Sequence, residues 1–243
     1  MQGRPKKVNE MAILSIALVI LIVIVACYPM IQSREEEELD IKNLMSGTIE
    51  IGCGMDSSNE VSGTGFIVEY DGVKVISNAH IVTYLDNGSY MPFDHISGRF
   101  FDDDTAYELN VTSFDRGLDI AVLAFVDISR HFSVLSFGDS DHIYYGDPVL
   151  TVGNARGNGL SASSGVVSIP LININDSRAV RPAIQTSITI NDGNSGGPLF
   201  DDRGQVIGMM SFRIRDSLGD IVNGMSFAVP SNEIRTYLDI VKV

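Results

Sequence analysis

The residues most able to do chemistry lie in segment 192–199, whose sequence is DGNSGGPL. Its serine, Ser195, stands among glycines, which let a backbone turn sharply and approach a substrate closely. Such a turn can expose a serine hydroxyl and aim backbone N–H groups at one point, as a nucleophile and its oxyanion hole require. The same residues could form an ordinary turn, so catalysis is indicated only if partners exist elsewhere in the chain.

A serine hydroxyl needs a base to take its proton, and the base is usually a histidine oriented by a carboxylate. His80 lies in the run VISNAHIV at 75–82, where a predicted strand enters a loop. Asp119 begins an apolar run, and an acid at such a position is costly to bury unless it has a partner. His95, His131 and His142 have contexts typical of surface or half-buried side chains, and Asp115, in a predicted loop, is expected to face solvent.

The order of these residues along the chain separates the known designs of serine hydrolase. Segment 193–197 matches the G-x-S-x-G turn of α/β-hydrolases, but in that design a histidine must follow the serine, and none follows Ser195. The subtilisin order needs an acid before His80, and the nearest one, Asp71, lies in a predicted hairpin turn. The order histidine, Asp119, serine is the chymotrypsin order, which belongs to a double β-barrel with its site between the barrels.

Composition and patterning predict an all-β protein. Glycine accounts for 23 of 243 residues, and short apolar runs are separated by Gly, Asp, Asn and Ser. About 200 residues follow the N-terminal segment, enough for two barrels of about 90 residues each. We expect these barrels at about 45–135 and 136–230 within a domain spanning 45–243. The last segment, 231–243, is predicted to be a short helix because its apolar residues recur at helical spacing.

Several motifs, in order and at consistent spacing from about residue 45 to about 240, resemble those of the HtrA (Deg) serine proteases. They are SNAHIV at 77–82, LDIAVL at 118–123, GDSD at 138–141, VGN at 152–154, SGVVS at 164–168, IQT at 184–186, GNSGGPL at 193–199 and FAVPSN at 227–232. The resemblance implies a trypsin-like fold with His80 as general base, Asp119 as its orienter and Ser195 as nucleophile. It also implies an oxyanion hole formed by the backbone N–H groups of Gly193 and Ser195.

The chain departs from the family pattern at two places. Arg156 stands where the family usually has an aromatic or aliphatic residue. The chain stops at Val243, so we expect it to lack the C-terminal PDZ domain that is common in the family.

Specificity is predicted to be for small or medium aliphatic P1 residues. Trypsin-like enzymes that cut after Arg or Lys carry an aspartate six positions before the nucleophile, and Thr189 occupies that position here. A basic side chain would therefore lose hydration without gaining a counter-ion. The resemblance places three further residues along the wall of this S1 pocket: Met209, Met210 and Ser211.

The N-terminal segment is predicted to be a membrane anchor. No charged residue occurs from 11 to 33, and a bilayer core needs roughly 20 apolar helical residues, so 11–31 can span it. Basic residues precede this stretch and an acidic run follows it. The positive-inside rule therefore places residues 1–10 in the cytoplasm and the protease domain, after an acidic linker at 32–44, outside it.

Two alternatives to an anchor stay open. A cleaved signal peptide normally has an apolar region of about 7–15 residues ending at small residues, whereas this stretch is longer. The sequence IVAC at 24–27 resembles a bacterial lipobox, which would place a lipid on Cys27. A lipoprotein, like an anchored protein, would stay on the membrane.

Charge and composition limit the partners and cofactors. The net charge of −14 argues against a nucleic-acid partner, which needs a basic face. No His/Cys/Asp cluster has metal-ligand spacing, so neither a metal nor an organic cofactor is expected. The two cysteines make no disulfide framework, and Cys53 is predicted to be a buried free thiol.

Together these features predict a membrane-tethered serine endopeptidase that cleaves proteins outside the cytoplasm. A role in protein quality control is an expectation from the resemblance. The alternative is a non-catalytic module that uses a protease fold to hold unfolded segments. Homo-oligomer formation and glycosylation of the three N-x-S/T sequons stay open.

Overall fold

The computed structural model describes residues 14–23, 25, 39–55, 61–175, 180–215 and 221–242, the side chains of 213–223 excepted. The chain divides into two units, Met1–Glu38 and Leu39–Val243, which are treated separately below. Most of the described residues of the second unit are in antiparallel strands, which confirms the all-β prediction.

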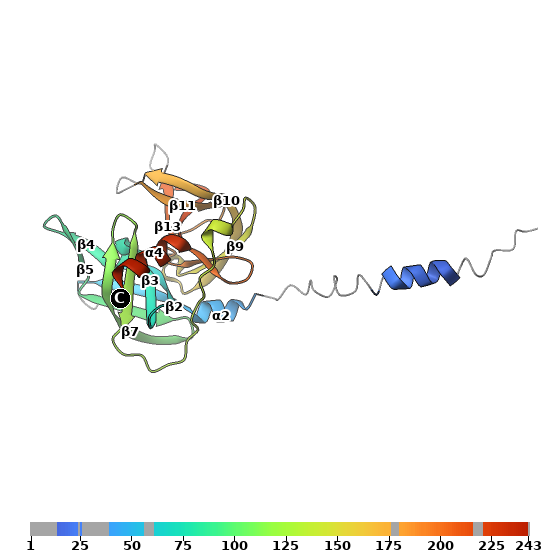
Figure 1. Ribbon diagram of the computed structural model, residues 1–243. Coiled ribbons are helices and arrows are strands. Elements are labelled where there is room, and N and C mark those ends of the chain that lie inside the picture. The colour runs from blue at the N-terminus through green and yellow to red at the C-terminus, as the bar shows by residue number, and fades with distance from the viewer. Residues whose placement is uncertain are drawn as a thin grey trace, which may run out of the picture. The chain divides into compact units, whose positions relative to one another are not determined.

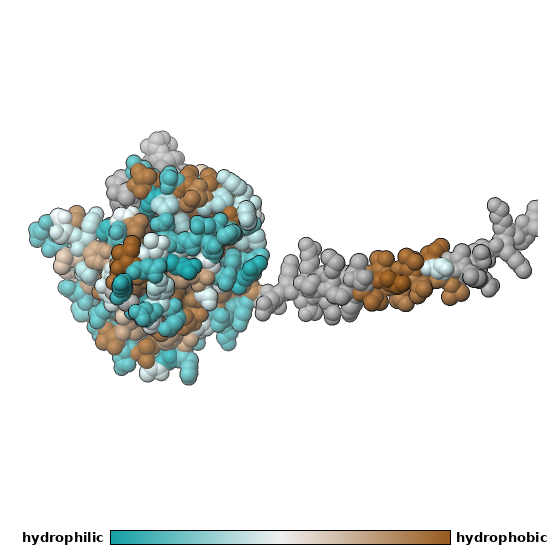
Figure 2. All heavy atoms as spheres, in the orientation of Figure 1, coloured by the Kyte–Doolittle hydropathy of each residue, from teal (hydrophilic) through white to brown (hydrophobic). Residues whose placement is uncertain are grey.

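In the first unit, residues 14–23 and 25 are helical. This helix exposes large aliphatic side chains, drawn in brown in Figure 2. Within the described ranges no helix has both the length and the apolar character needed to cross a membrane. Much of the predicted span at 11–31, including Cys27, lies outside the described residues, so the anchor stays a prediction.

The second unit contains two closed six-stranded barrels (Figure 1). The first has the strand order β1-β2-β3-β8-β7-β6 and the second the order β10-β11-β14-β13-β12-β9. The strands of the first barrel are β1 (Thr48–Gly54), β2 (Val61–Glu69), β3 (Val73–Ser77), β6 (His95–Phe100), β7 (Asp103–Asp115) and β8 (Ile120–Phe125). Those of the second are β9 (Pro148–Gly153), β10 (Ser161–Asn175), β11 (Val180–Thr186), β12 (Pro198–Phe200), β13 (Val206–Arg215) and β14 (Ile221–Pro230).

Short elements complete the second unit. They are α2 (Ile41–Ser46), α3 (Ala79–Val82), the hairpin β4 (Thr83–Asp86) and β5 (Ser89–Pro92), the 3₁₀ turns η1 (Ser140–His142) and η2 (Ala155–Gly157), and α4 (Ser231–Val241). The β2–β3 connection has positive φ at both Asp71 and Gly72, as a tight hairpin turn requires. Asp71 therefore belongs to a turn, as predicted from the sequence.

The buried side chains form three hydrophobic clusters, one inside each barrel and one between the barrels. One fills the first barrel and another the second. The third joins them and includes Phe66 of β2, Val152 of β9 and Ile234 of α4. Adjacent residues of β3 point to different clusters, Val75 into the first barrel and Ile76 into the interface, so this strand is buried on both faces.

Helix α4 is part of the interface between the barrels and not a separate terminal appendage. It follows β14 directly, and its buried residues Ile234, Tyr237 and Leu238 belong to the cluster that joins the barrels. The hydroxyl groups of Tyr237 and Ser113 form a hydrogen bond that ties the helix to β7 of the first barrel.

We expect Phe66→Ala to lower the free energy of unfolding by about 3–5 kcal/mol, because it removes a fully buried ring from the interface and leaves a cavity. Urea unfolding followed by circular dichroism measures this change. Tyr145→Ala, at an aromatic side chain that is 73% exposed, is the matched control and should stay within about 0.5 kcal/mol. Equal losses in the two variants would contradict the assigned interface.

Candidate active site

His80 and Asp119 are joined by hydrogen bonds in the first barrel. His80 lies in α3, the single helical turn that follows β3. Its Nδ1 is 2.8 Å from Oδ2 and 3.0 Å from Oδ1 of Asp119, and its backbone N–H donates to Oδ1 at 3.0 Å. A carboxylate only accepts hydrogen bonds, so Nδ1 carries a proton, and in the neutral ring Nε2 is then free to accept one.

Asp119 lies in the turn that connects β7 and β8, and its carboxylate is completely buried. Besides its bonds to His80, it accepts a hydrogen bond of 2.7 Å from the hydroxyl of Ser211 on β13. The residue has φ of 62°, a left-handed conformation that is uncommon outside glycine. Its carbonyl accepts a 3.0 Å bond from Nδ2 of Asn78, which helps to hold this turn.

Ser195 lies in the glycine-rich loop between β11 and β12, half-buried. Gly193 and Gly196 both have positive φ, of 97° and 88°. A Cβ on Gly193 would come within 2.0 Å of the carbonyl oxygen of Asn154, and one on Gly196 within 2.0 Å of that of Thr64. The loop therefore needs glycine at both positions, for its backbone conformation and for its close packing.

Strands of both barrels hold this loop. Thr64 of β2 donates its N–H to the carbonyl of Ser195 at 2.9 Å and its hydroxyl to that of Gly193 at 2.7 Å. From the second barrel, the carbonyl of Met210 accepts the N–H of Gly196 at 2.8 Å. The serine is therefore fixed at the junction of the two barrels.

Ser211 links the serine to the carboxylate. The hydroxyl of Ser195 donates to the carbonyl of Ser211 at 2.9 Å, while the hydroxyl of Ser211 donates to Asp119. Between the described side chains of Ser195 and His80 there is no hydrogen bond. The serine hydroxyl must therefore rotate away from Ser211 before His80 can take its proton. Hydrogen bonds between catalytic groups often shorten to a productive geometry only when substrate binds.

The backbone N–H groups of Gly193 and Ser195 donate no hydrogen bond within the described part of the chain, which leaves both available to a ligand. The orientation of the peptide before Gly193 is set by Arg156, whose N–H donates to the carbonyl of Asp192 at 2.7 Å. Because carbonyl and N–H point in opposite directions across a trans peptide, this bond also fixes the direction of the Gly193 N–H.

A buried acid stabilises the loop that carries Arg156. Glu50 of β1 accepts hydrogen bonds from Nδ2 of Asn154 at 2.9 Å and from the guanidinium of Arg99 at 2.7 Å. The N–H of Asn154 in turn donates to the hydroxyl of Thr64. Sequence reasoning missed Glu50, Asn154 and Thr64 as supports. The isolated charge inside the buried strand TIEIGCG was a signal that could have pointed to Glu50.

The predicted specificity residues occupy different environments. Thr189 is exposed. Met209 and Met210 are fully buried in the hydrophobic clusters, and Ser211 is buried against Asp119. The structure therefore brings Ser211 to the candidate catalytic group, while the role of all four residues in an S1 pocket stays a prediction.

The other candidates lie apart from this group. His95, His131 and His142 are exposed, and Nδ1 of His142 is 2.7 Å from Oδ2 of Asp139. Asp115, predicted to face solvent, is partly buried and accepts the N–H of Leu118 at 2.8 Å.

The buried Cys53 thiol is free, and burial raises its pKa to about 12, so it stays protonated and unreactive at neutral pH.

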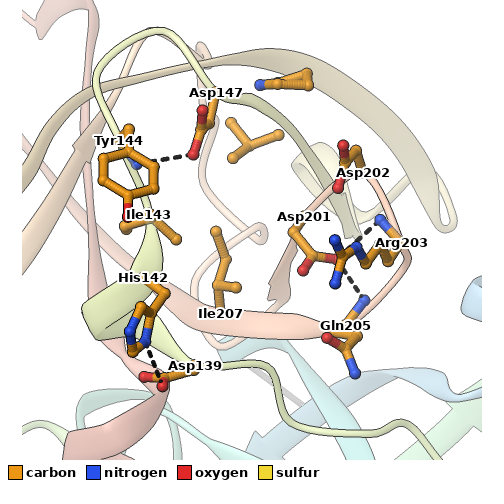
Figure 3. Close-up of a pocket in the computed structure, with 12 residues that line it drawn as sticks. Asp139, His142, Ile143, Tyr144, Asp147, Asp201, Asp202, Arg203, Gln205 and Ile207 are labelled. Atoms are coloured by element: carbon orange, nitrogen blue, oxygen red, sulfur yellow. Dashed lines mark hydrogen bonds and ion pairs between the residues drawn. The ribbon is translucent and has the colours of Figure 1, made fainter.

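A cavity of about 360 Å³ lies in the second barrel between η1, β9 and the β12–β13 hairpin (Figure 3). Its lining includes Asp139, His142, Asp201 and Arg203, and none of the residues described above as the candidate site. Hydrogen bonds from Asn232, from the N–H of Asp141 and from His142 lower the pKa of Asp139 to about 2. The described residues contain no group of three or more His, Cys, Asp or Glu that could hold a metal ion.

Comparisons with known proteins identify the family of the chain. The model of the trypsin-like peptidase domain family matches residues 63–209. A DegP-like periplasmic serine endoprotease of Chlamydia pneumoniae is 37% identical over 175 residues, which is 72% of this chain and 33% of the relative. The HtrA Do-like serine protease of Lactobacillus helveticus is 38% identical over 133 residues, 53% of this chain and 32% of the relative.

A solved structure of the HtrA-type protease AlgW with a tripeptide superimposes with a TM-score of 0.67 at 25% identity, covering 82% of this chain and 62% of that one. The chain spans about a third of the length of the curated relatives that it matches. The matched range includes His80, Asp119 and Ser195. The chain therefore belongs to the trypsin-like peptidase family, and the relatives that it matches are proteases of the HtrA and DegP type.

Proposed function

We propose that the chain is a serine endopeptidase of HtrA type with His80, Asp119 and Ser195 as its catalytic triad. One observation carries this proposal: a buried carboxylate holds both Nδ1 and the backbone N–H of His80, and Ser211 joins that carboxylate to the loop of Ser195. Family membership supports the same activity.

Each of these groups has a role in the proposed acyl transfer. Nε2 of His80 takes the proton of the Ser195 hydroxyl while the oxygen attacks the scissile carbonyl, and Asp119 stabilises the imidazolium that forms. The N–H groups of Gly193 and Ser195 donate hydrogen bonds to the developing oxyanion, and one such donor is worth about 2.7–4 kcal/mol of barrier. His80 then gives its proton to the leaving amine, and water releases the acyl group by the same steps.

The hydrogen bond from Ser195 to Ser211 must break at the start of this sequence. Exchanging one intramolecular hydrogen bond for another costs little, because a typical bond contributes only about 0.5–1.5 kcal/mol net. The new bond to His80 replaces the one lost, so the rotation adds little to the barrier.

We expect Ser195→Ala and His80→Ala each to lower kcat on a protein substrate by a factor on the order of 10⁶, because a triad acts as a unit. Asp119→Asn should lower it about 10⁴-fold, since the amide cannot hold the reactive tautomer. Cleavage of a quenched fluorescent casein and labelling by a fluorophosphonate probe measure these losses.

His142→Ala is the matched control, because His142 also pairs with an aspartate but lies outside the candidate site. It should keep activity within about tenfold, or about 1.4 kcal/mol of barrier. A Ser195→Ala protein that cleaves casein as fast as the wild type would disprove the triad. A folded wild type that neither cleaves nor reacts with the probe would favour the non-catalytic holding module.

We also propose that the enzyme prefers small or medium aliphatic P1 residues. Support comes from the uncharged Thr189 at the position where Arg/Lys-specific enzymes carry an aspartate. A single methylene in an apolar pocket is worth only about 1–3 kcal/mol, so the preference should be broad. Mass spectrometry of the peptides released from denatured proteins is expected to show mainly Val, Ala, Ile or Leu at P1. A dominance of Arg, Lys, Asp or Glu would show that the pocket is assigned wrongly.

We further propose that the protease domain is tethered to a membrane and faces the outside of the cytoplasm, where it degrades misfolded or membrane-proximal proteins. The uncharged stretch at 11–33 and the basic residues before it support the tether. The compartment is supported by the DegP-like relatives, which are periplasmic serine endoproteases.

Protease added to intact cells or spheroplasts should digest the domain at 39–243, because the positive-inside rule places it outside. The membrane fraction should contain a chain whose N-terminus lies before residue 11. A domain that is digested only after lysis would contradict the proposed orientation. A mature chain beginning at a lipid-modified Cys27 would replace the anchor with a lipoprotein.

A further inference from the structure

Arg181 on β11 is a buried cation of the second barrel, with only 3% of its side chain exposed. Arginine is almost never buried to that extent unless it is paired, because removing its charge from water is costly. Its surroundings therefore show what it is paired with and what depends on it. The proposed triad does not use this residue.

The guanidinium of Arg181 reaches the turn that carries Asp119. Its Nη1 donates to the carbonyl of Leu118 at 2.9 Å and lies 3.6 Å from Oδ2 of Asp119. Its Nη2 lies 3.4 Å from the hydroxyl of Ser211, which itself donates to Asp119. The guanidinium carbon lies 5.0 Å from the ring centroid of Phe212. A side chain of the second barrel thus contacts a backbone group and a carboxylate of the first.

These contacts hold Asp119 in an unfavourable backbone conformation. Asp119 has φ of 62°, and a non-glycine residue keeps such a conformation only where its surroundings hold it. Arg181 holds the carbonyl on the N-terminal side of Asp119, and Asn78 holds the carbonyl on the C-terminal side. Both peptide groups next to Asp119 are therefore fixed by side-chain donors.

The position of the Asp119 carboxylate determines where the His80 ring lies, because both carboxylate oxygens are bonded to His80. A displacement of about 1 Å in a catalytic group can lower a rate by on the order of 10²-fold. Fixing the Leu118–Asp119 turn is therefore a way of fixing the general base.

We propose that Arg181 is a positioning residue: it reaches across the barrel interface and holds the Leu118 carbonyl and the Asp119 carboxylate in the arrangement that orients His80. The inference rests on the proposed protease function. It differs from a purely structural ion pair in acting on kcat through Asp119.

The test makes substitutions at Arg181 both in the wild-type protein and in an Asp119→Asn variant, which lacks the carboxylate. Arg181→Met keeps the apolar stem but removes the charge and donors, and Arg181→Lys keeps the charge. We expect Arg181→Met to lower kcat by about 10- to 100-fold with KM changed less than about threefold, and Arg181→Lys to recover part of the loss. In an Asp119→Asn background, Arg181→Met should change the fluorophosphonate labelling rate less than about threefold, since residues that act through one another are not additive.

Arg130→Met is the matched control. Arg130 is also largely buried, pairs with Asp102 and Asp103 and lies over the ring of Phe100, but it has no contact with the candidate site. Its substitution should leave kcat within about twofold of the wild type. Circular dichroism spectra identify the variants that fold, and only those variants are compared. If Arg181→Met does not fold, Arg181→Lys is compared in both backgrounds, with at least a threefold loss of kcat expected only when Asp119 is present.

The proposal is overturned if Arg181→Met keeps kcat within twofold of the wild type, or if it lowers activity by the same factor with and without the Asp119 carboxylate. Ser195→Ala in the same assays separates the two levels of inference. If Ser195→Ala remains fully active, the proposed protease function fails. If Ser195→Ala is inactive and Arg181→Met is as active as the wild type, only the role of Arg181 fails.

Discussion

A carboxylate without contact to water is stable only where hydrogen-bond donors and positive charge surround it, and the environment of Asp119 meets that requirement from both barrels. The first barrel supplies the backbone N–H and the ring of His80, and the second supplies the hydroxyl of Ser211 and the nearby guanidinium of Arg181. Neither barrel alone provides this set. The site therefore depends on how the barrels pack, and the hydrophobic cluster between them serves the chemistry as well as the stability.

Thr64 is a second contact through which the site depends on the packing of the two barrels. Its N–H and hydroxyl bind two carbonyl groups of the loop that carries Ser195, and its hydroxyl also accepts the N–H of Asn154. A single residue of the first barrel thus helps to hold two loops of the second. Since the direction of the Gly193 N–H follows from the loop of Asn154, the geometry of the oxyanion hole is linked to Thr64 and, through Asn154, to the buried Glu50.

The sequence allowed the fold to be predicted because its signals are local. Apolar runs of strand length, the Asp71 hairpin turn and the order of the three candidate catalytic residues indicated a double β-barrel, and the structure contains two closed barrels. The supports of the site are contacts between residues far apart in the chain, such as Arg181 with Leu118 and Thr64 with Gly193. Nothing in the local pattern around these residues specifies a partner, so the sequence did not predict them.

Ser211 shows how one residue can serve both barrels at once. Its hydroxyl stabilises the carboxylate and its carbonyl holds the Ser195 hydroxyl, so the resting serine is bonded to the same strand that buries the acid. A substrate that pairs with this strand, as extended peptides pair with strand edges, would approach the Ser211 carbonyl directly. Competition for that carbonyl would release the serine hydroxyl next to His80. Binding and activation of the nucleophile would then be linked through one backbone group.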